Sequence, residues 1–230
     1  MTTIETDSIK ASYLSFLNNK DFPCIAAKAA MAKQHINCMV ADHMACPKDD
    51  YNILQFLYDF IDKYRAANEF YYSAVVIFKE PAIIEESLFD QLLWQRLQSL
   101  SNLDARQYAY DKRVNADPAS PHFSFSLKEE GLYIIGLHPG SSRPARRFAH
   151  PAMVFNPHAQ FEQLRHEDRY EKMKAVVRKR DTLYAGSVNP MLSDFGEASE
   201  VYQYSGRNYD TSWQCPLKIN HATTNHHSAT

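Results

Sequence analysis

The stretch YYSAVVIF, residues 71–78, combines β-branched and aromatic side chains and does not alternate with polar residues. A strand with one face in solvent alternates between apolar and polar residues, whereas a strand buried on both faces is apolar throughout. The stretch therefore predicts an inner strand of a sheet that other elements cover on both sides. Pro81, which lacks a backbone N–H, ends it.

Segments before and after this strand have apolar residues at helical spacing or are rich in helix-forming residues. One of them follows Asp21 and Pro23 and is rich in Ala, Met and Lys. Asp21 is its expected N-cap, and Cys24 is expected in its first turn. The predicted helices span residues 8–18, 24–43, 51–67, 83–100 and 160–181.

A hairpin is predicted in the second half of the chain. HFSFSL, residues 122–127, alternates with period two, and a short turn at 129–131 leads into LYIIGLH, residues 132–138. AMVFN, residues 152–156, predicts one more strand. After Thr182 the periodicity is lost.

This order of elements predicts an α+β fold with a small, mainly antiparallel sheet covered by helices. A single domain is expected over residues 1–217, and it ends in an irregular C-terminal segment. Residues 218–230, KINHATTNHHSAT, are expected to form a disordered tail.

Composition narrows the class of partner. The chain has 230 residues and a net charge of −2, whereas nucleic-acid-binding domains are usually basic. No apolar run approaches the roughly 20 residues of a membrane helix, and the start, MTTIETDSIK, is too polar for a signal peptide. Four cysteines follow no secreted disulfide pattern. We therefore expect a cytoplasmic protein without nucleic-acid or membrane partners.

The segment GLHPGSSRPARRFAHPAMVFNPHAQFE, residues 136–162, is rich in proline, histidine and arginine. Arginine holds carboxylate or phosphate oxygens through paired N–H donors, so the segment predicts a site for an anionic group. A solvated basic loop is an equally good interpretation. The donors expected to hold the anion are Ser141, Ser142, Arg143, Arg146 and Arg147.

Cysteine supplies two candidate iron ligands or nucleophiles. At a helix N-terminus, Cys24 would face unpaired N–H groups that favour its thiolate, and Lys28 would add positive charge one turn later. Cys215 lies in WQCPL, a Cys-Pro pair next to an aromatic residue, but Cys46 also precedes a proline. A small buried hydrophobic residue is the alternative interpretation of Cys24.

Histidines at strand ends are further candidates, since such positions commonly line sites. His138 ends one predicted strand and His158 follows another, and each could equally be an ordinary loop histidine. The chain has no H-E-x-x-H, no G-x-S-x-G and no glycine-rich phosphate loop, which argues against zincin, hydrolase and nucleotide chemistry.

The segment NPMLSDFGEASEVYQYSGR, residues 189–207, is too long for a passive connector. Its acidic residues could bind a cationic substrate. The alternative interpretation is local capping and turn chemistry, which explains Ser193, Asp194 and Gly196 well. The polar side chains in question are Asn189, Asp194, Glu197, Glu200, Tyr202, Tyr204 and Arg207.

Several blocks along the chain together resemble the YqcI/YcgG family over residues 22–217. Within it, they resemble the haem-dependent N-hydroxylases of guanidino groups, of the pre-guanitoxin N-hydroxylase and arginine N-hydroxylase type. In chain order the blocks are FPCIAAKAA, SAVVIF, HFSFSL, GLHPGSSRPARRF, VFNPHAQFEQLR, RKRD, GSVNPMLSDFG, QYSGR and WQCPL.

The resemblance implies haem b as cofactor, with its propionates held by the arginine-rich segment. It makes Cys24 the preferred iron ligand and Cys215 the second choice, with His138 or His158 if the iron is ligated by nitrogen. Glu162 or Asp194 would hold the guanidinium. The expected cofactor contacts are Cys24, Lys28, Ser142, Arg143, Arg146, Arg147, Arg207 and Cys215.

The implied reaction is N-hydroxylation of a small, amino-acid-like guanidino substrate, with O2 and an external electron donor. A homodimer is left open. Two other functions are kept beside it: a haem-binding or haem-sensing protein without turnover, and a non-haem enzyme with Cys24 as nucleophile.

Overall fold

The computed structural model describes residues 3–67, 69–187, 191 and 195–221. Its sheet has five strands in the spatial order β1-β2-β5-β4-β3. β1 and β2 run parallel, and the other neighbours are antiparallel, so the sheet is mixed and mainly antiparallel, as predicted. The strands are β1 (Ile36–His43), β2 (Ser73–Glu80), β3 (Phe125–Leu127), β4 (Glu130–Leu137) and β5 (Ala152–Pro157).

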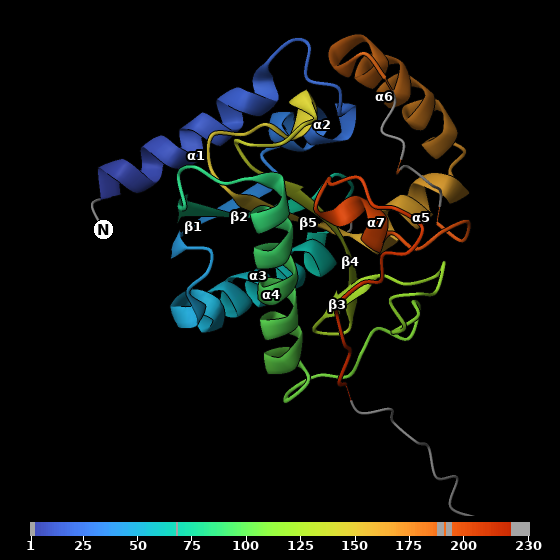
Figure 1. Ribbon diagram of the computed structural model, residues 1–230. Coiled ribbons are helices and arrows are strands. Elements are labelled where there is room, and N and C mark those ends of the chain that lie inside the picture. Colours follow the sequence, from blue (N-terminus) through green and yellow to red (C-terminus); the bar gives the residue numbers. More distant parts are fainter. Residues whose placement is uncertain (1–2, 68, 188–190, 192–194, 222–230) are drawn as a thin grey trace, which may run out of the picture.

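Helices cover both faces of this sheet. Figure 1 shows α1, α2 and α6 on one side and α3 and α4 on the other. Two single turns of 3-10 helix, η1 (Pro47–Asp49) and η2 (Pro144–Arg146), lie in the connections. The helices are α1 (Thr3–Asn18), α2 (Ile25–Ala32), α3 (Asp50–Ala67), α4 (Glu86–Asp104), α5 (His158–His166), α6 (Tyr170–Ala185) and α7 (Val201–Tyr204).

β2 is the inner strand that the apolar run predicts. Side chains of a strand point alternately to the two faces. Val75 and Ile77 accordingly pack in the apolar cluster under α1, whereas Ala74, Val76 and Phe78 pack in the cluster under α3 and α4. All five are buried, which explains why this strand shows no polar alternation.

The helix predicted over residues 24–43 is wrong in its second half. The helix ends at Ala32, and Ile36–His43 forms β1, which pairs in parallel with β2. The chain turns at Gln34, whose φ is 59°, a left-handed conformation that a glycine would normally mark. No glycine or proline marks this turn in the sequence. The residues before it are good helix formers, so the predicted helix continued past the point where the real helix ends.

The other predicted elements agree with the structure except at their ends and in the last long helix. The hairpin is confirmed, with Phe125–Leu127 antiparallel to β4. The long helix predicted over 160–181 is two helices, because the chain turns at Asp168, whose φ is 55°. Again no glycine marks the turn.

The chain remains packed beyond the predicted end of the domain. The backbone N–H of Lys218 donates to Gln98 Oε1 at 2.7 Å, and His221 Nε2 lies 2.8 Å from Asp104 Oδ2. Both partners belong to α4, so the described part of the expected tail is bound to that helix. Residues 222–230 lie outside the described residues. Among the helices that the structure describes, none is both long and apolar enough to cross a membrane.

Candidate functional site

A cavity of about 330 Å³ lies between one face of the sheet and helices α1, α2, α5 and α6. It is large enough for a small-molecule ligand, since such sites begin at about 300 Å³. Its walls are mostly apolar. The helical lining includes Tyr13, Leu17, Ala26, Ala27, Phe161, Leu164, Met173 and Val177.

The strand register gives the floor of this cavity a polar end and an apolar remainder. Across β2, β5 and β4, one transverse row consists of Ser73, Asn156 and Tyr133, with Ser73 Oγ donating to Asn156 Oδ1 at 2.6 Å. The next two rows along the strands are apolar. They contain Val75, Val154 and Ile135, then Ile77, Ala152 and Leu137, of which Val154, Ile135 and Leu137 line the cavity.

Cys24 lies in the apolar part of the cavity wall. It is the N-cap of α2, and its Sγ accepts a hydrogen bond from the backbone N–H of Ala27 at 3.4 Å. The sequence places the N-cap at Asp21, three residues too early. Burial raises the pKa of the Cys24 thiol, and the backbone hydrogen bonds from Ala27 and Ala26 lower it by less. The N–H groups at the helix N-terminus thus favour the thiolate as expected, but burial outweighs them and the net shift of the pKa is upward.

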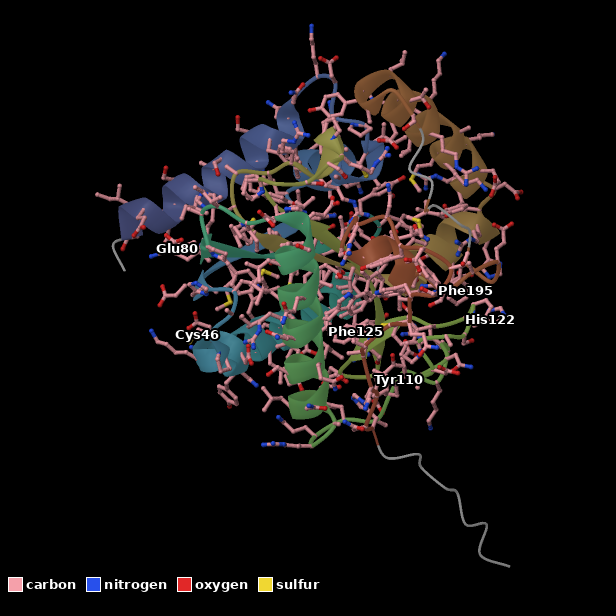
Figure 2. All side chains as sticks on the ribbon, in the orientation of Figure 1. Cys46, Glu80, Tyr110, His122, Phe125 and Phe195 are labelled. Atoms are coloured by element: carbon pink, nitrogen blue, oxygen red, sulfur yellow. The ribbon has the colours of Figure 1, made fainter. Side chains whose placement is uncertain are left out.

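His158 occupies the polar end, at the start of α5. Its Nε2 lies 3.3 Å from Glu162 Oε1, and its Nδ1 lies 3.9 Å from Glu200 Oε2. Burial lowers the pKa of His158, so the ring is neutral at pH 7. The ring of Phe195 packs over it with centroids 4.3 Å apart, and Figure 2 shows Phe195 beside His122 at this edge of the molecule.

Two buried carboxyl groups line the cavity: Asp181, which is paired with Arg143, and Glu200. Only 6% of Glu200 is exposed, and its Oε1 accepts hydrogen bonds from Ser124 Oγ at 2.9 Å and from the Tyr204 hydroxyl. Burial raises the pKa of Glu200 to about 8, against the lowering effect of those two donors. The sequence indicated the segment that contains Glu200 but nominated Glu162 and Asp194 in its place. Glu162 does not line the cavity and contacts two residues that do, His158 and Arg165; Asp194 lies outside the described residues.

The three arginines of the β4–β5 loop (residues 138–151) bond to the protein itself. Arg143 Nη2 donates to Asp181 Oδ2 at 2.6 Å. Arg146 is buried and donates to the carbonyl oxygens of Gly136, Gln203 and Tyr204. Arg147 donates to loop carbonyls, at 3.0 Å for its Nε. Arg143 and Arg146 line the cavity, but their guanidinium groups are already partnered; Arg147 does not line it.

Three predicted site residues lie on the opposite face, under α4. His138 is fully buried and stacks on Phe89, with ring centroids 4.2 Å apart. Arg207 Nη1 lies 3.4 Å from Asp90 Oδ2. Cys215 packs in the apolar cluster under α3 and α4, and burial raises the pKa of its thiol to about 12. None of these three residues lines the cavity.

Two more predicted contacts serve local structure. Lys28 Nζ donates to the carbonyl oxygens of Asn19 and Lys20 and so caps the C-terminal end of α1. The Ser142 hydroxyl donates to Glu86 Oε1 at 2.9 Å. Neither lines the cavity. The cations that do line it, apart from Arg143 and Arg146, are Arg165, Lys174 and Arg178 of α5 and α6, which the sequence did not single out.

Cys24, Arg143, Arg146 and His158 are thus the predicted site residues that the fold brings to one cavity. Within residues 3–67, 69–187, 191 and 195–221, no three His, Cys, Asp or Glu side chains cluster so that they could hold a metal ion. Among the described residues, the cavity therefore offers a metal ion isolated ligands and no cluster of them. These ligands are Cys24 Sγ in the apolar part and the His158 ring at the polar end.

The family model of the YqcI/YcgG family matches residues 13–218, so the chain belongs to this family. No curated protein and no solved structure matches the chain.

Proposed function

We propose that this YqcI/YcgG protein is a haem-dependent monooxygenase that N-hydroxylates the guanidino group of a small, amino-acid-like substrate with O2 and external electrons. The observation that carries the proposal is the composition of the cavity. One wall presents a lone cysteine over an apolar floor, and the far end presents a buried carboxyl group beside a neutral imidazole. A cofactor and a polar substrate can each find a matching environment there.

The residue types present suit a haem group, and a cavity of about 330 Å³ must widen to admit a porphyrin together with a substrate. A flat porphyrin needs apolar walls, which the rows of Val154 and Ile135 and the facing helices supply. It needs one protein ligand to iron, and Cys24 Sγ lines the cavity. Coordination to iron deprotonates a thiol, so the raised pKa of Cys24 is no obstacle. Arg165, Lys174 and Arg178 also line the cavity and would supply positive charge for the propionates, in addition to the ion pairs of Arg165 with Glu162 and of Lys174 with Glu171.

When bound, the haem would supply the activation of O2, which ligation by a thiolate favours. Tyr133, held by a 2.7 Å hydrogen bond from its hydroxyl to Gln203 Oε1, orients ligands at the polar end. Phe195 shields His158 from water. His158 can move a proton between its Nε2 and Glu162 Oε1. One oxygen atom of O2 enters the substrate, and the other leaves as water with two electrons and two protons.

The geometry argues against Cys24 as a nucleophile in a non-haem enzyme. Its Sγ accepts hydrogen bonds from the backbone N–H groups of Ala27 and Ala26, which are no general base, and burial raises the pKa of the thiol. A nucleophilic cysteine needs the opposite, a lowered pKa or an adjacent base. A haem-binding protein without turnover uses the same cavity and is separated from the enzyme by experiment.

Titration of the purified full chain with hemin tests the cofactor. A saturable Soret band at one hemin per chain is expected. Ile135→Trp, which fills the middle of the cavity floor, should abolish it. The same substitution at Ile83, which is 91% exposed, should leave hemin binding unchanged. A colourless protein, or equal binding by both variants, contradicts the proposal.

Turnover is tested with the hemin-loaded protein, a chemical reductant, O2 and a panel of guanidino compounds. The enzyme is expected to yield a product heavier by one oxygen atom. Stoichiometric hemin binding without such a product from any guanidino compound would identify the sensor instead.

A further inference from the structure

The two oxygen atoms of the Glu200 carboxyl group have different surroundings. Oε1 is fixed, because it accepts hydrogen bonds from Ser124 Oγ and from the Tyr204 hydroxyl. Tyr204 is itself held by the backbone N–H of Phe125, which donates to its hydroxyl oxygen at 3.1 Å. The orientation of the carboxyl group is therefore set by β3 and α7 before any ligand arrives.

Oε2 has no such partner among the described residues. His158 Nδ1 lies 3.9 Å from Oε2, which is too far for a hydrogen bond. No lysine or arginine of the described chain forms an ion pair with Glu200, although the residue is 94% buried. A buried carboxylate without a cation is costly, and it is usually paired or protonated.

The surroundings of Oε2 suit a planar cation. Glu200 lines the cavity together with Tyr133 and Phe195, whose rings are also part of the lining. Guanidinium groups bind carboxylates through paired N–H donors and stack on aromatic faces. The polar row of Ser73 and Asn156 lies at the same end of the floor and offers further hydrogen-bonding groups.

We propose that Glu200, through its Oε2 atom, binds the cationic group of the substrate at the polar end of the cavity. That this cation is a guanidinium rests on the proposed function. Glu162 is then not the binding carboxylate, because it is paired with Arg165 and is 41% exposed.

The protonation state of Glu200 supports this assignment. Burial raises its pKa to about 8, so at pH 7 the empty cavity holds the neutral acid. The titratable groups that face it are His158 and Arg165 of α5, Tyr204 of α7, Tyr133 of β4 and Tyr110 of the loop before β3. An arriving cation favours the carboxylate and should expel the proton.

The first test compares L-arginine with L-citrulline, its neutral isostere, by calorimetry on the full chain with and without hemin. The wild type should bind arginine roughly 10- to 100-fold more tightly, the worth of a hydrogen bond to a charged group. Glu200→Gln should remove that preference. Glu85→Gln, the same change at an exposed carboxylate that does not line the cavity, should keep it. Binding of arginine that Glu200→Gln leaves unchanged overturns the assignment.

A second measurement needs only the wild type, so it stands even if Glu200→Gln does not fold. Binding of arginine in buffers of different ionisation enthalpy reports the protons released. Release should approach one proton per arginine at pH 7 and should vanish well above pH 8, where Glu200 is already ionised. No release at pH 7, or no binding of arginine, agmatine or guanidinium at all, overturns the assignment.

The outcomes separate this inference from the proposed function. If the protein binds hemin and its binding of arginine does not depend on Glu200, only the Glu200 site is contradicted. If the protein stays colourless with hemin and binds guanidinium cations through Glu200, only the haem proposal is contradicted.

Discussion

Arg143 Nη2 lies 2.6 Å from Asp181 Oδ2, and this ion pair joins the β4–β5 loop to α6 beside the cavity. The two side chains are 11% and 10% exposed. Arg143 is therefore committed to a buried carboxylate of its own chain. Its first role is to hold α6 over the sheet, and any contact with a bound anion would come in addition.

Replacement of Arg143 by alanine should lower the free energy of unfolding by about 3 kcal/mol, because Asp181 would keep a buried charge without this partner. Unfolding in urea measures the loss. The control is Arg147→Ala, since Arg147 is exposed and bonds to the loop carbonyls of Ser141 and Ser142. It should cost less than about 1 kcal/mol. Equal losses in the two variants would contradict this account of the loop.

His138 should make the fold sensitive to acid. Burial lowers its pKa from 6.5 to about 4, and neither ring nitrogen has a hydrogen-bond partner among the described residues. The native state thus disfavours the protonated ring. The stability that the neutral ring contributes is complete above pH 6.5 and is lost as the pH falls from 6.5 towards 4, by about 3 kcal/mol at most.

Unfolding free energies measured between pH 4 and pH 8 check this. His138→Leu should flatten the acid side of the profile, since it removes the titrating group and replaces orphaned polar atoms with an apolar side chain. His43→Leu, the same change at an exposed histidine, should keep the profile of the wild type. A profile for His138→Leu that follows the wild type at every pH would show that His138 is not responsible.

Cys24 should alkylate slowly in the hemin-free protein. Burial raises the pKa of its thiol, and iodoacetamide reacts with thiolates. Cys46 is exposed, so it should be modified first, with Cys24 slower by roughly tenfold or more. Peptide mass spectrometry over a time course measures both rates, and hemin should slow Cys24 further without affecting Cys46. If Cys24 reacts as fast as Cys46, the prediction is contradicted, and the result supports Cys24 as a nucleophile.

The sequence predicted most of the fold because burial leaves a direct signal in composition. The apolar run at 71–78 identified β2 and implied a sheet covered on both faces. β1 was missed because the turn before it uses Gln34 in a left-handed conformation, without the glycine that would normally mark the turn. The break between α5 and α6 at Asp168 was missed for the same reason.

The site was predictable only in part, since sequence gives residue type and spacing but not which face of a sheet a loop reaches. Cys24 and His158, both of which the sequence singled out, lie at one cavity. Cys215 and His138 have equally suggestive neighbours in sequence, yet they lie under α4 on the other face. Glu200 carried no distinguishing signal, because its anchoring by Ser124 joins residues far apart in the chain.

The proposed function requires a haem in this cavity with the sulfur of Cys24 on its iron. The absorption spectrum of the reduced, hemin-loaded protein under carbon monoxide tests this most directly, because thiolate ligation shifts the Soret band strongly to longer wavelength. The wild type and Cys215→Ser should show the shifted band, and Cys24→Ser should lose it. A Cys24→Ser protein that keeps the shifted band, or a wild type that never shows it, would contradict the account.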